Sequence, residues 1–138
     1  MAEVATVLVV DDDGAYRAFL RASLEAAGFA VAEAEDGPAA HAEALRLRPE
    51  VVLLDWRMPG ESGIVALRRL RAEPRLEGVR IAMVTGLDDP RDRDLARHAG
   101  ADAFLVKTGD PDALTAQVRR LLAGGEARFD RRAPQRLL

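Results

Sequence analysis

The stretch VATVLVV, residues 4–10, is a continuous apolar run that leads directly into three acidic residues, Asp11, Asp12 and Asp13. A run without polar alternation is typical of a strand in a parallel sheet that is covered on both faces. Four more runs of this kind follow, at residues 29–34, 51–54, 79–84 and 103–106. The pattern therefore predicts five strands of a buried parallel sheet.

The segments between these runs have apolar residues at helical spacing, as in the stripe formed by Tyr16, Leu20 and Leu24. An Ala-rich segment after Gly37 completes a set of five predicted helices. Polar caps and glycines mark where these helices begin and end. The residues with these signals are Gly28, Ser62, Asp89, Gly100 and Asp110. Alternating strands and helices predict an α/β protein, a doubly wound (βα)5 sheet of the flavodoxin-like kind.

The chain has the size and composition of one domain with its own core. It contains 138 residues, of which 49% are hydrophobic and 31% are charged. The pattern stops after Gly124, so we expect a domain over residues 1–124 and a polar C-terminal tail over residues 125–138. We expect His41 and His98, the two histidines, to have structural or solvent-facing positions.

Composition also excludes several classes of site and partner. The absence of cysteine excludes disulfides and thiol chemistry. A net charge of −3 gives no general attraction to nucleic acid or anionic lipid, so nucleic acid is not an expected partner. No apolar run approaches the ~20 residues of a membrane span, and a signal peptide pattern is missing. We therefore expect a cytoplasmic protein without a membrane partner.

Polar residues that can bind a ligand or take part in a reaction follow the ends of the predicted strands. Ligands of open α/β sheets bind beyond the carboxyl ends of the strands, so these residues should lie together. They are Asp11, Asp12, Asp55, Thr85 and Lys107. Lys107 is the single lysine among the 20 Lys and Arg residues. This indicates that the position requires a compact ammonium and not the wider, planar guanidinium of arginine.

This set of side chains suits phosphoryl transfer to a carboxylate. Converging carboxylates favour a hard divalent cation such as Mg²⁺, which prefers oxygen ligands. One carboxylate can then act as the nucleophile towards phosphorus, while a hydroxyl and an ammonium contact the phosphoryl oxygens. An acid that follows a strand can also have a purely structural role. We expect Asp13 to cap a helix, and Glu35 and Asp36 to serve the turn after the second strand.

Four segments, taken in order, resemble the receiver domain of two-component response regulators. They are VLVVDDD (7–13), VVLLDWRMPGESG (51–63), IAMVTG (81–86) and GADAFLVK (100–107). The resemblance implies that Asp55 is the phosphoacceptor and that Mg²⁺, with Mn²⁺ as an alternative, is the cofactor. It implies a metal site formed by Asp11, Asp12, Asp55 and the backbone carbonyl of Arg57. It further implies a phosphoryl-binding and switch set formed by Thr85, Lys107, Phe104 and Gly86.

The same resemblance implies the kind of function and the partners. The chain would be a switch that catalyses only its own phosphorylation and dephosphorylation, with a sensor histidine kinase or phosphotransfer protein as donor. A downstream protein, or a second copy of the chain, would bind the face made by the fourth helix, fifth strand and fifth helix. Two alternatives stay open: a receiver-like interaction module that is never phosphorylated, and a haloacid-dehalogenase-type phosphatase with Asp11 as nucleophile and Asp13 as general acid.

The chain departs from the pattern of receiver domains near the expected switch. Thr108 follows Lys107 where the family usually has proline, often after a cis peptide bond. Because a cis bond before another residue costs about 3 kcal/mol, we expect a trans bond here. Gly86 replaces the commoner Ala or Ser, and Phe104 lacks the hydroxyl of the commoner Tyr. Trp56, next to Asp55, is expected to be a half-buried anchor for its loop.

Overall fold

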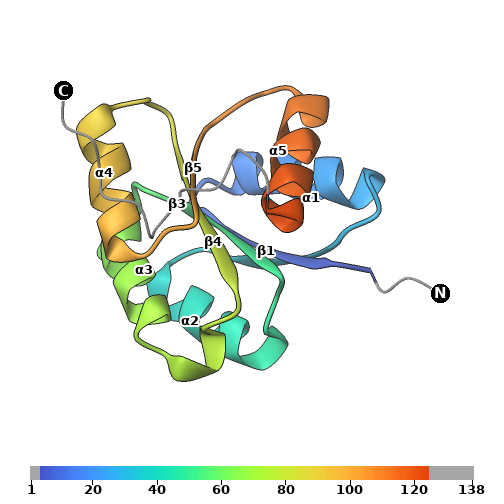
Figure 1. The fold of residues 1–138 in the computed structure, drawn as a ribbon. Helices are drawn as coiled ribbons and strands as arrows, with labels where there is room; N and C mark the ends of the chain where they lie inside the picture. The colour runs from blue at the N-terminus through green and yellow to red at the C-terminus, as the bar shows by residue number, and fades with distance from the viewer. Residues whose placement is uncertain (1–3, 125–138) are drawn as a thin grey trace.

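The computed structural model describes residues 4–124, so the predicted tail at 125–138 lies outside the described residues. Within this range the chain forms one five-stranded sheet in the order β2-β1-β3-β4-β5, and every neighbouring pair is parallel (Figure 1). The strands are β1 (Thr6–Val10), β2 (Ala30–Ala34), β3 (Val51–Asp55), β4 (Arg80–Thr85) and β5 (Ala103–Val106). The predicted parallel sheet is confirmed, with strand ends shifted by one or two residues.

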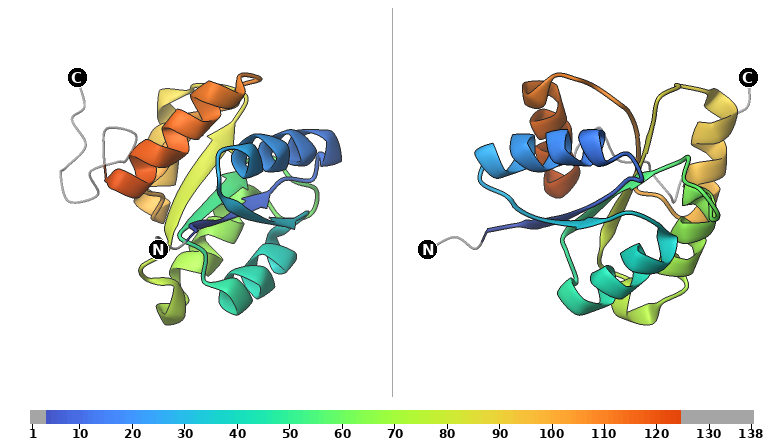
Figure 2. Two further views of the ribbon diagram at one scale, coloured as in Figure 1. Left: turned by 90° about the vertical axis from the view of Figure 1, so that its right-hand side faces the viewer. Right: turned by 180° about the vertical axis from the view of Figure 1, so that it is seen from behind.

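Helices cover both faces of the sheet, as predicted for a doubly wound fold. They are α1 (Gly14–Ala26), α2 (Gly37–Leu47), α3 (Gly63–Arg71), α4 (Pro90–Ala99) and α5 (Pro111–Ala123). Helices α1 and α5 lie side by side on one face, and α2, α3 and α4 lie on the other (Figures 1 and 2). A short 3₁₀ helix, η1 (Pro74–Leu76), was not predicted from the sequence pattern.

The continuous apolar runs supply two cores at once. Successive side chains of a strand point to opposite faces, so a fully apolar strand contributes to both layers. In β1, Leu8 and Val10 pack with the core beneath α2, α3 and α4. Val7 and Val9 pack with the core beneath α1 and α5. The central strands are therefore buried on both faces, and this holds their carboxyl ends in fixed positions at one edge of the sheet.

Acidic caps begin four of the helices close to that edge. The side chains of Asp13, Asp36, Asp89 and Asp110 each accept hydrogen bonds from backbone N–H groups in the first turn of α1, α2, α4 and α5. Such bonds satisfy donors that have no partner inside the helix. The structural interpretation of Asp13 and Asp36 is thus confirmed.

Ser62 differs from the predicted cap. It occupies the N-cap position of α3, but within residues 4–124 its side chain accepts no capping hydrogen bond. The backbone carbonyl of Ser62 instead accepts from the N–H groups of Val65 and Ala66, at 3.1 Å each. At the other helix ends, Gly100 and Gly124 adopt positive φ after α4 and α5, while α1 already ends at Ala26, two residues before Gly28.

A buried ion pair stabilises the opposite edge of the sheet. Arg71, at the end of α3, pairs with Asp102, which is 3% exposed and directly precedes β5. Asp102 also accepts a hydrogen bond from the N–H of Ile81 at 2.8 Å, and Arg71 donates to the carbonyls of Gly100 and Val79 at 2.7 Å. These contacts join α3, β4 and β5. None of the helices in the described range is long and apolar enough to cross a membrane.

Candidate functional site

The carboxyl ends of β1, β3, β4 and β5 surround a cavity of about 420 Å³. All five of the polar residues expected at this edge line it. The residues that line the cavity are Asp11, Asp12, Asp13, Asp55, Trp56, Arg57, Thr85, Gly86, Leu87 and Lys107. The structure therefore brings together side chains that are separated by up to 96 positions in the chain.

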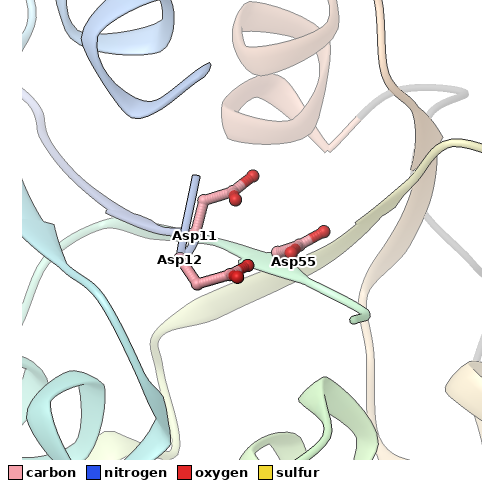
Figure 3. Close-up of side chains that lie close together, drawn as sticks. All are labelled: Asp11, Asp12 and Asp55. Carbon is pink, nitrogen blue, oxygen red and sulfur yellow. The ribbon is translucent and has the colours of Figure 1, made fainter. Parts of the chain in front are cut away.

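Three carboxylates lie at the centre of this site. Asp11 and Asp12 extend from the end of β1, and Asp55 ends the neighbouring strand β3 (Figure 3). One oxygen from each carboxylate lies within 4.8 Å of the others. Asp11 and Asp55 are buried, at 2% and 5% exposure, whereas Asp12 is exposed. A group of carboxylate oxygens that is open on one side fits a hard divalent cation that keeps part of its water shell.

The environment of Asp55 makes its carboxyl a weak acid. Burial, the largest cause, and the charge of Asp11 together raise its pKa from 3.8 to about 6. The ammonium of Lys107 acts in the opposite direction but does not cancel these effects. A carboxylate with a pKa of about 6 is mostly ionised at pH 7, and it is more basic than an ordinary aspartate.

Lys107 connects the two buried acids. Its Nζ lies 3.1 Å from Oδ2 of Asp11 and 3.2 Å from Oδ1 of Asp55. Burial acts to lower the pKa of Lys107, but the hydrogen bond to Asp11 and the charges of both carboxylates outweigh burial and raise it. The lone lysine therefore stays protonated and holds its charge between two acids.

Residues around β4 complete the rim of the cavity. Thr85 is buried, and its hydroxyl accepts a hydrogen bond from the N–H of Leu87 at 3.3 Å. Its backbone carbonyl accepts from the N–H of Lys107 at 2.7 Å, which ties the end of β5 to the end of β4. At Gly86, a Cβ would have no described heavy atom within 4 Å, so the glycine leaves open space beside the cavity.

Phe104 and Trp56 form a contact behind the site. Phe104 is 5% exposed, and its ring lies edge-on to Trp56 at a centroid distance of 6.3 Å. The guanidinium of Arg93 in α4 lies 4.8 Å from the centroid of Phe104. Trp56 is half-buried, donates its backbone N–H to Val84 and accepts from Gly63, as expected for an anchor of the loop.

Gly63 and Tyr16 were not identified from the sequence as residues of the site. A Cβ on Gly63 would lie 2.1 Å from the backbone oxygen of Asp55, so glycine is required where α3 approaches the end of β3. Tyr16, assigned only to an apolar helical stripe, contacts Lys107 and Thr108. Neither contact has a local signal, because each depends on elements that meet only in the folded chain.

Other predicted features can be placed in the same way. The residues in the range 4–124 have no cis peptide bond, so the bond between Lys107 and Thr108 is trans, as expected. His98 is exposed with Nδ1 2.8 Å from the carbonyl of Asp94, and Nε2 of His41 lies 3.9 Å from Oε2 of Glu73; neither histidine lines the cavity. The carboxylate of Asp13 is engaged in capping α1, which weakens its alternative assignment as a general acid.

Comparison with known proteins agrees with this geometry. Residues 7–119 match the family model of the response regulator receiver domain. The chain is 34% identical over 117 residues to the phosphate regulon transcriptional regulatory protein PhoB of Pseudomonas aeruginosa, covering 85% of this chain and 51% of that protein. It is 40% identical over 116 residues to the DNA-binding response regulator MtrA of Mycobacterium tuberculosis, covering 84% of this chain and 50% of that protein.

Among solved structures, chemotaxis protein CheY4 of Vibrio cholerae superposes with a TM-score of 0.83 at 30% identity, covering 86% of this chain and 99% of that one. The chain spans about half the length of PhoB and MtrA. Because MtrA is named as a DNA-binding protein, the comparisons give no support to the expectation that nucleic acid is an improbable partner. The family match, the shared fold and the arrangement of strand-end residues lead to one conclusion: the chain belongs to the response regulator receiver domain family.

Proposed function

We propose that the chain is a phosphorylation-controlled signalling switch in which Asp55 accepts a phosphoryl group from a phosphohistidine. The donor would be a sensor histidine kinase or a phosphotransfer protein. The position of Asp55 carries the proposal: the residue is only 5% exposed, yet it lines an open cavity with three other carboxylates, a hydroxyl and an ammonium. A carboxylate with a purely structural role would not require these neighbouring groups.

In the proposed step, a carboxylate oxygen of Asp55 forms the new bond to phosphorus. The bond between phosphorus and the donor's imidazole nitrogen breaks, and that nitrogen keeps the electron pair. Nζ of Lys107 already lies 3.2 Å from Oδ1 of Asp55, so a small movement of the ammonium would bring it into contact with the new phosphoryl oxygens. The hydroxyl of Thr85 lines the same cavity and can donate to a second oxygen.

Asp11, Asp12 and Asp55, with the backbone carbonyl of Arg57, would hold Mg²⁺, or Mn²⁺ in its place. The support is that the three carboxylates offer oxygens within 4.8 Å of one another and that Arg57 lines the same cavity. A bound divalent cation supplies positive charge that offsets the repulsion between a phosphoryl group and the acids.

Intact mass measurement tests the proposal directly. Wild-type protein incubated with acetyl phosphate and Mg²⁺ should gain the mass of one phosphoryl group, and EDTA should prevent the gain. Asp55→Ala should gain no mass, whereas Asp36→Ala, which loses the cap of α2 and does not line the cavity, should still be phosphorylated. A folded wild-type protein without any gain would favour the alternative of an interaction module.

The output surface is proposed to be the face of α4, β5 and α5. Phe104 in β5 is buried, and its ring contacts both Trp56, which lines the cavity, and the guanidinium of Arg93 in α4. A change at the phosphoryl group can therefore alter the packing of this face through Phe104. Leu87 and Leu95 are exposed on the α4 side, at 62% and 41%. A downstream protein or a second copy of the chain would bind here, which light scattering with and without phosphodonor would reveal.

A further inference from the structure

Tyr16 makes three contacts with the segment that carries Lys107. Its ring centroid lies 4.7 Å from Nζ of Lys107. Its hydroxyl lies 3.1 Å from the backbone carbonyl of Thr108, to which it donates, and accepts from the N–H of the same residue at 3.3 Å. Thr108 is 92 positions away in the chain, so this contact joins the first turn of α1 to the loop after β5.

The ring of Tyr16 gives the ammonium of Lys107 a third contact, in addition to the two carboxylates. Asp11 and Asp55 hold the ammonium through oxygens at 3.1 and 3.2 Å. A cation is attracted to the face of an aromatic ring, so the Tyr16 ring adds a contact without displacing either carboxylate. Since a lysine side chain is long and flexible, this third contact restricts where its charge can lie.

The hydroxyl of Tyr16 also fixes the backbone just after Lys107. One phenolic group can donate one hydrogen bond and accept others, so it can satisfy the carbonyl and the N–H of Thr108 together. The N–H of Lys107 donates to the carbonyl of Thr85, and the hydroxyl of Thr108 accepts from the N–H of Asp110. The loop is thereby attached to β4, to α1 and to the cap of α5.

Thr108 matters to this arrangement because it has an N–H group. A proline at this position would have a fixed φ and no donor for the Tyr16 hydroxyl. In this chain the backbone after Lys107 is trans and is held from outside by a side chain of α1.

We propose that Tyr16 is a positioning residue for phosphotransfer, which holds the 107–109 loop and the Lys107 ammonium at the reach that Asp55 requires. This proposal rests on the proposed function of Asp55. It assigns the ring to the ammonium and the hydroxyl to the loop, so the two parts of the side chain can be tested separately.

The competing explanation is that Tyr16 only packs. Its ring lies 5.5 Å from that of Phe19, and both residues pack against the core beneath α1 and α5. Tyr16→Phe keeps this packing and removes only the hydroxyl, whereas Tyr16→Leu also removes the aromatic face. Phe19→Leu is the matched control, because it removes the neighbouring ring on the same helix.

The first measurement uses unphosphorylated protein and therefore does not depend on the proposed function. In spectra of protein labelled with nitrogen-15 and carbon-13, Tyr16→Phe should shift the amide resonance of Thr108 and leave the Lys107 methylene protons shifted by the ring. Tyr16→Leu should abolish that ring shift, and Phe19→Leu should preserve both features. Unchanged Thr108 and Lys107 signals in both Tyr16 variants would overturn the proposal, even if wild-type protein accepts no phosphate.

The second measurement follows the rate of mass gain with acetyl phosphate at saturating Mg²⁺. Tyr16→Phe should slow the gain about three- to tenfold, the effect of losing about one net hydrogen bond, and Tyr16→Leu should slow it further. Phe19→Leu should lower the unfolding midpoint but keep the wild-type rate. Equal rates in wild type and Tyr16→Phe, or equal slowing by Tyr16→Leu and Phe19→Leu, would show that Tyr16 only packs. Wild-type protein that gains no mass would instead refute the proposed function.

Discussion

The ammonium of Lys107 lies between the carboxylates of Asp55 and Asp11, 3.2 and 3.1 Å away, and is the cation that both acids share. Asp12 adds a third carboxylate to the group. Three acids facing one ammonium leave an excess of negative charge at a largely buried place. Like charges and burial both disfavour ionisation. In the absence of metal, the ionised acids of this site therefore lower the stability of the folded protein.

Replacing Asp55 by Asn should stabilise the protein at pH 7 in EDTA. Folding raises the pKa of Asp55 from 3.8 to about 6, so the folded state binds more protons than the unfolded state between these values. Stability is therefore lost as the pH rises through this window, and Asn, which does not ionise, escapes that loss. The expected gain is roughly 1–3 kcal/mol at pH 7.

Urea denaturation at pH 7 and pH 4 provides the check. The gain from Asp55→Asn should shrink towards pH 4, where the wild-type carboxyl of the folded state is protonated. Asp112→Asn, at an exposed position in the first turn of α5, should change the stability little at either pH. A stabilisation that is the same at both pH values would contradict this electrostatic explanation.

Trp56 should report on metal binding through its fluorescence. It is the single tryptophan, lines the cavity and lies against Phe104, so a cation among the three acids changes the field and packing around its ring. Titration with Mg²⁺ should give a saturable change, and a second change should follow phosphorylation of Asp55. Asp12→Ala should lose the response to Mg²⁺ because only two carboxylates remain. A flat titration in folded wild-type protein would refute the site.

Much of this fold could be predicted because it follows from short-range patterns. Continuous apolar runs can satisfy two cores at once, and they lead to acids and a lysine at the carboxyl ends of the strands. The prediction that Asp11, Asp55, Thr85 and Lys107 lie together needs only parallel strands with a shared edge. Their roles in phosphorylation are still predictions that the experiments above will test.

Contacts between distant elements could not be predicted in this way. Tyr16 resembles any apolar residue of an amphipathic helix, and its hydroxyl meets Thr108 only when α1 and the loop after β5 come together. Asp102 was part of a matching segment, yet its pairing with Arg71 depends on the end of α3. Ser62 has the residue type of a cap, but the carbonyl of its own backbone forms the bonds to the first turn.

Asp102→Ala should destabilise the fold strongly. The change leaves the guanidinium of Arg71, which is 13% exposed, without its carboxylate partner and removes the acceptor for the N–H of Ile81. Breaking a buried pair from one side typically costs about 3–5 kcal/mol. Urea denaturation measures this loss. Asp88→Ala is the control, since it breaks an exposed pair with Arg93 that should contribute less than about 1 kcal/mol. Similar losses in the two variants would argue against a structural role for the buried pair.

Lys107→Arg should keep the charge of the site but uncouple phosphorylation from the switch. A guanidinium is wider and planar, with hydrogen bonds in fixed directions, so it should pair with Asp11 and Asp55 in a different geometry. Asp55 and the carboxylates proposed to hold Mg²⁺ are unchanged, so acetyl phosphate should still add mass. The coupling to Thr85 and Phe104 should fail.

The measurement that separates these two effects is the phosphorylation-dependent shift of amide resonances in α4 and β5. Wild-type protein should show shifts that extend from Thr85 and Trp56 at the rim of the cavity through Phe104 to Arg93, because the Phe104 ring contacts both Trp56 and the Arg93 guanidinium. Lys107→Arg, phosphorylated to the same extent by mass, should show shifts near Asp55 only. Arg93→Lys, which keeps a cation near the Phe104 ring, should behave like wild type. Equal shifts in wild type and Lys107→Arg would mean that any cation at position 107 operates the switch, and the single lysine would then have no special function.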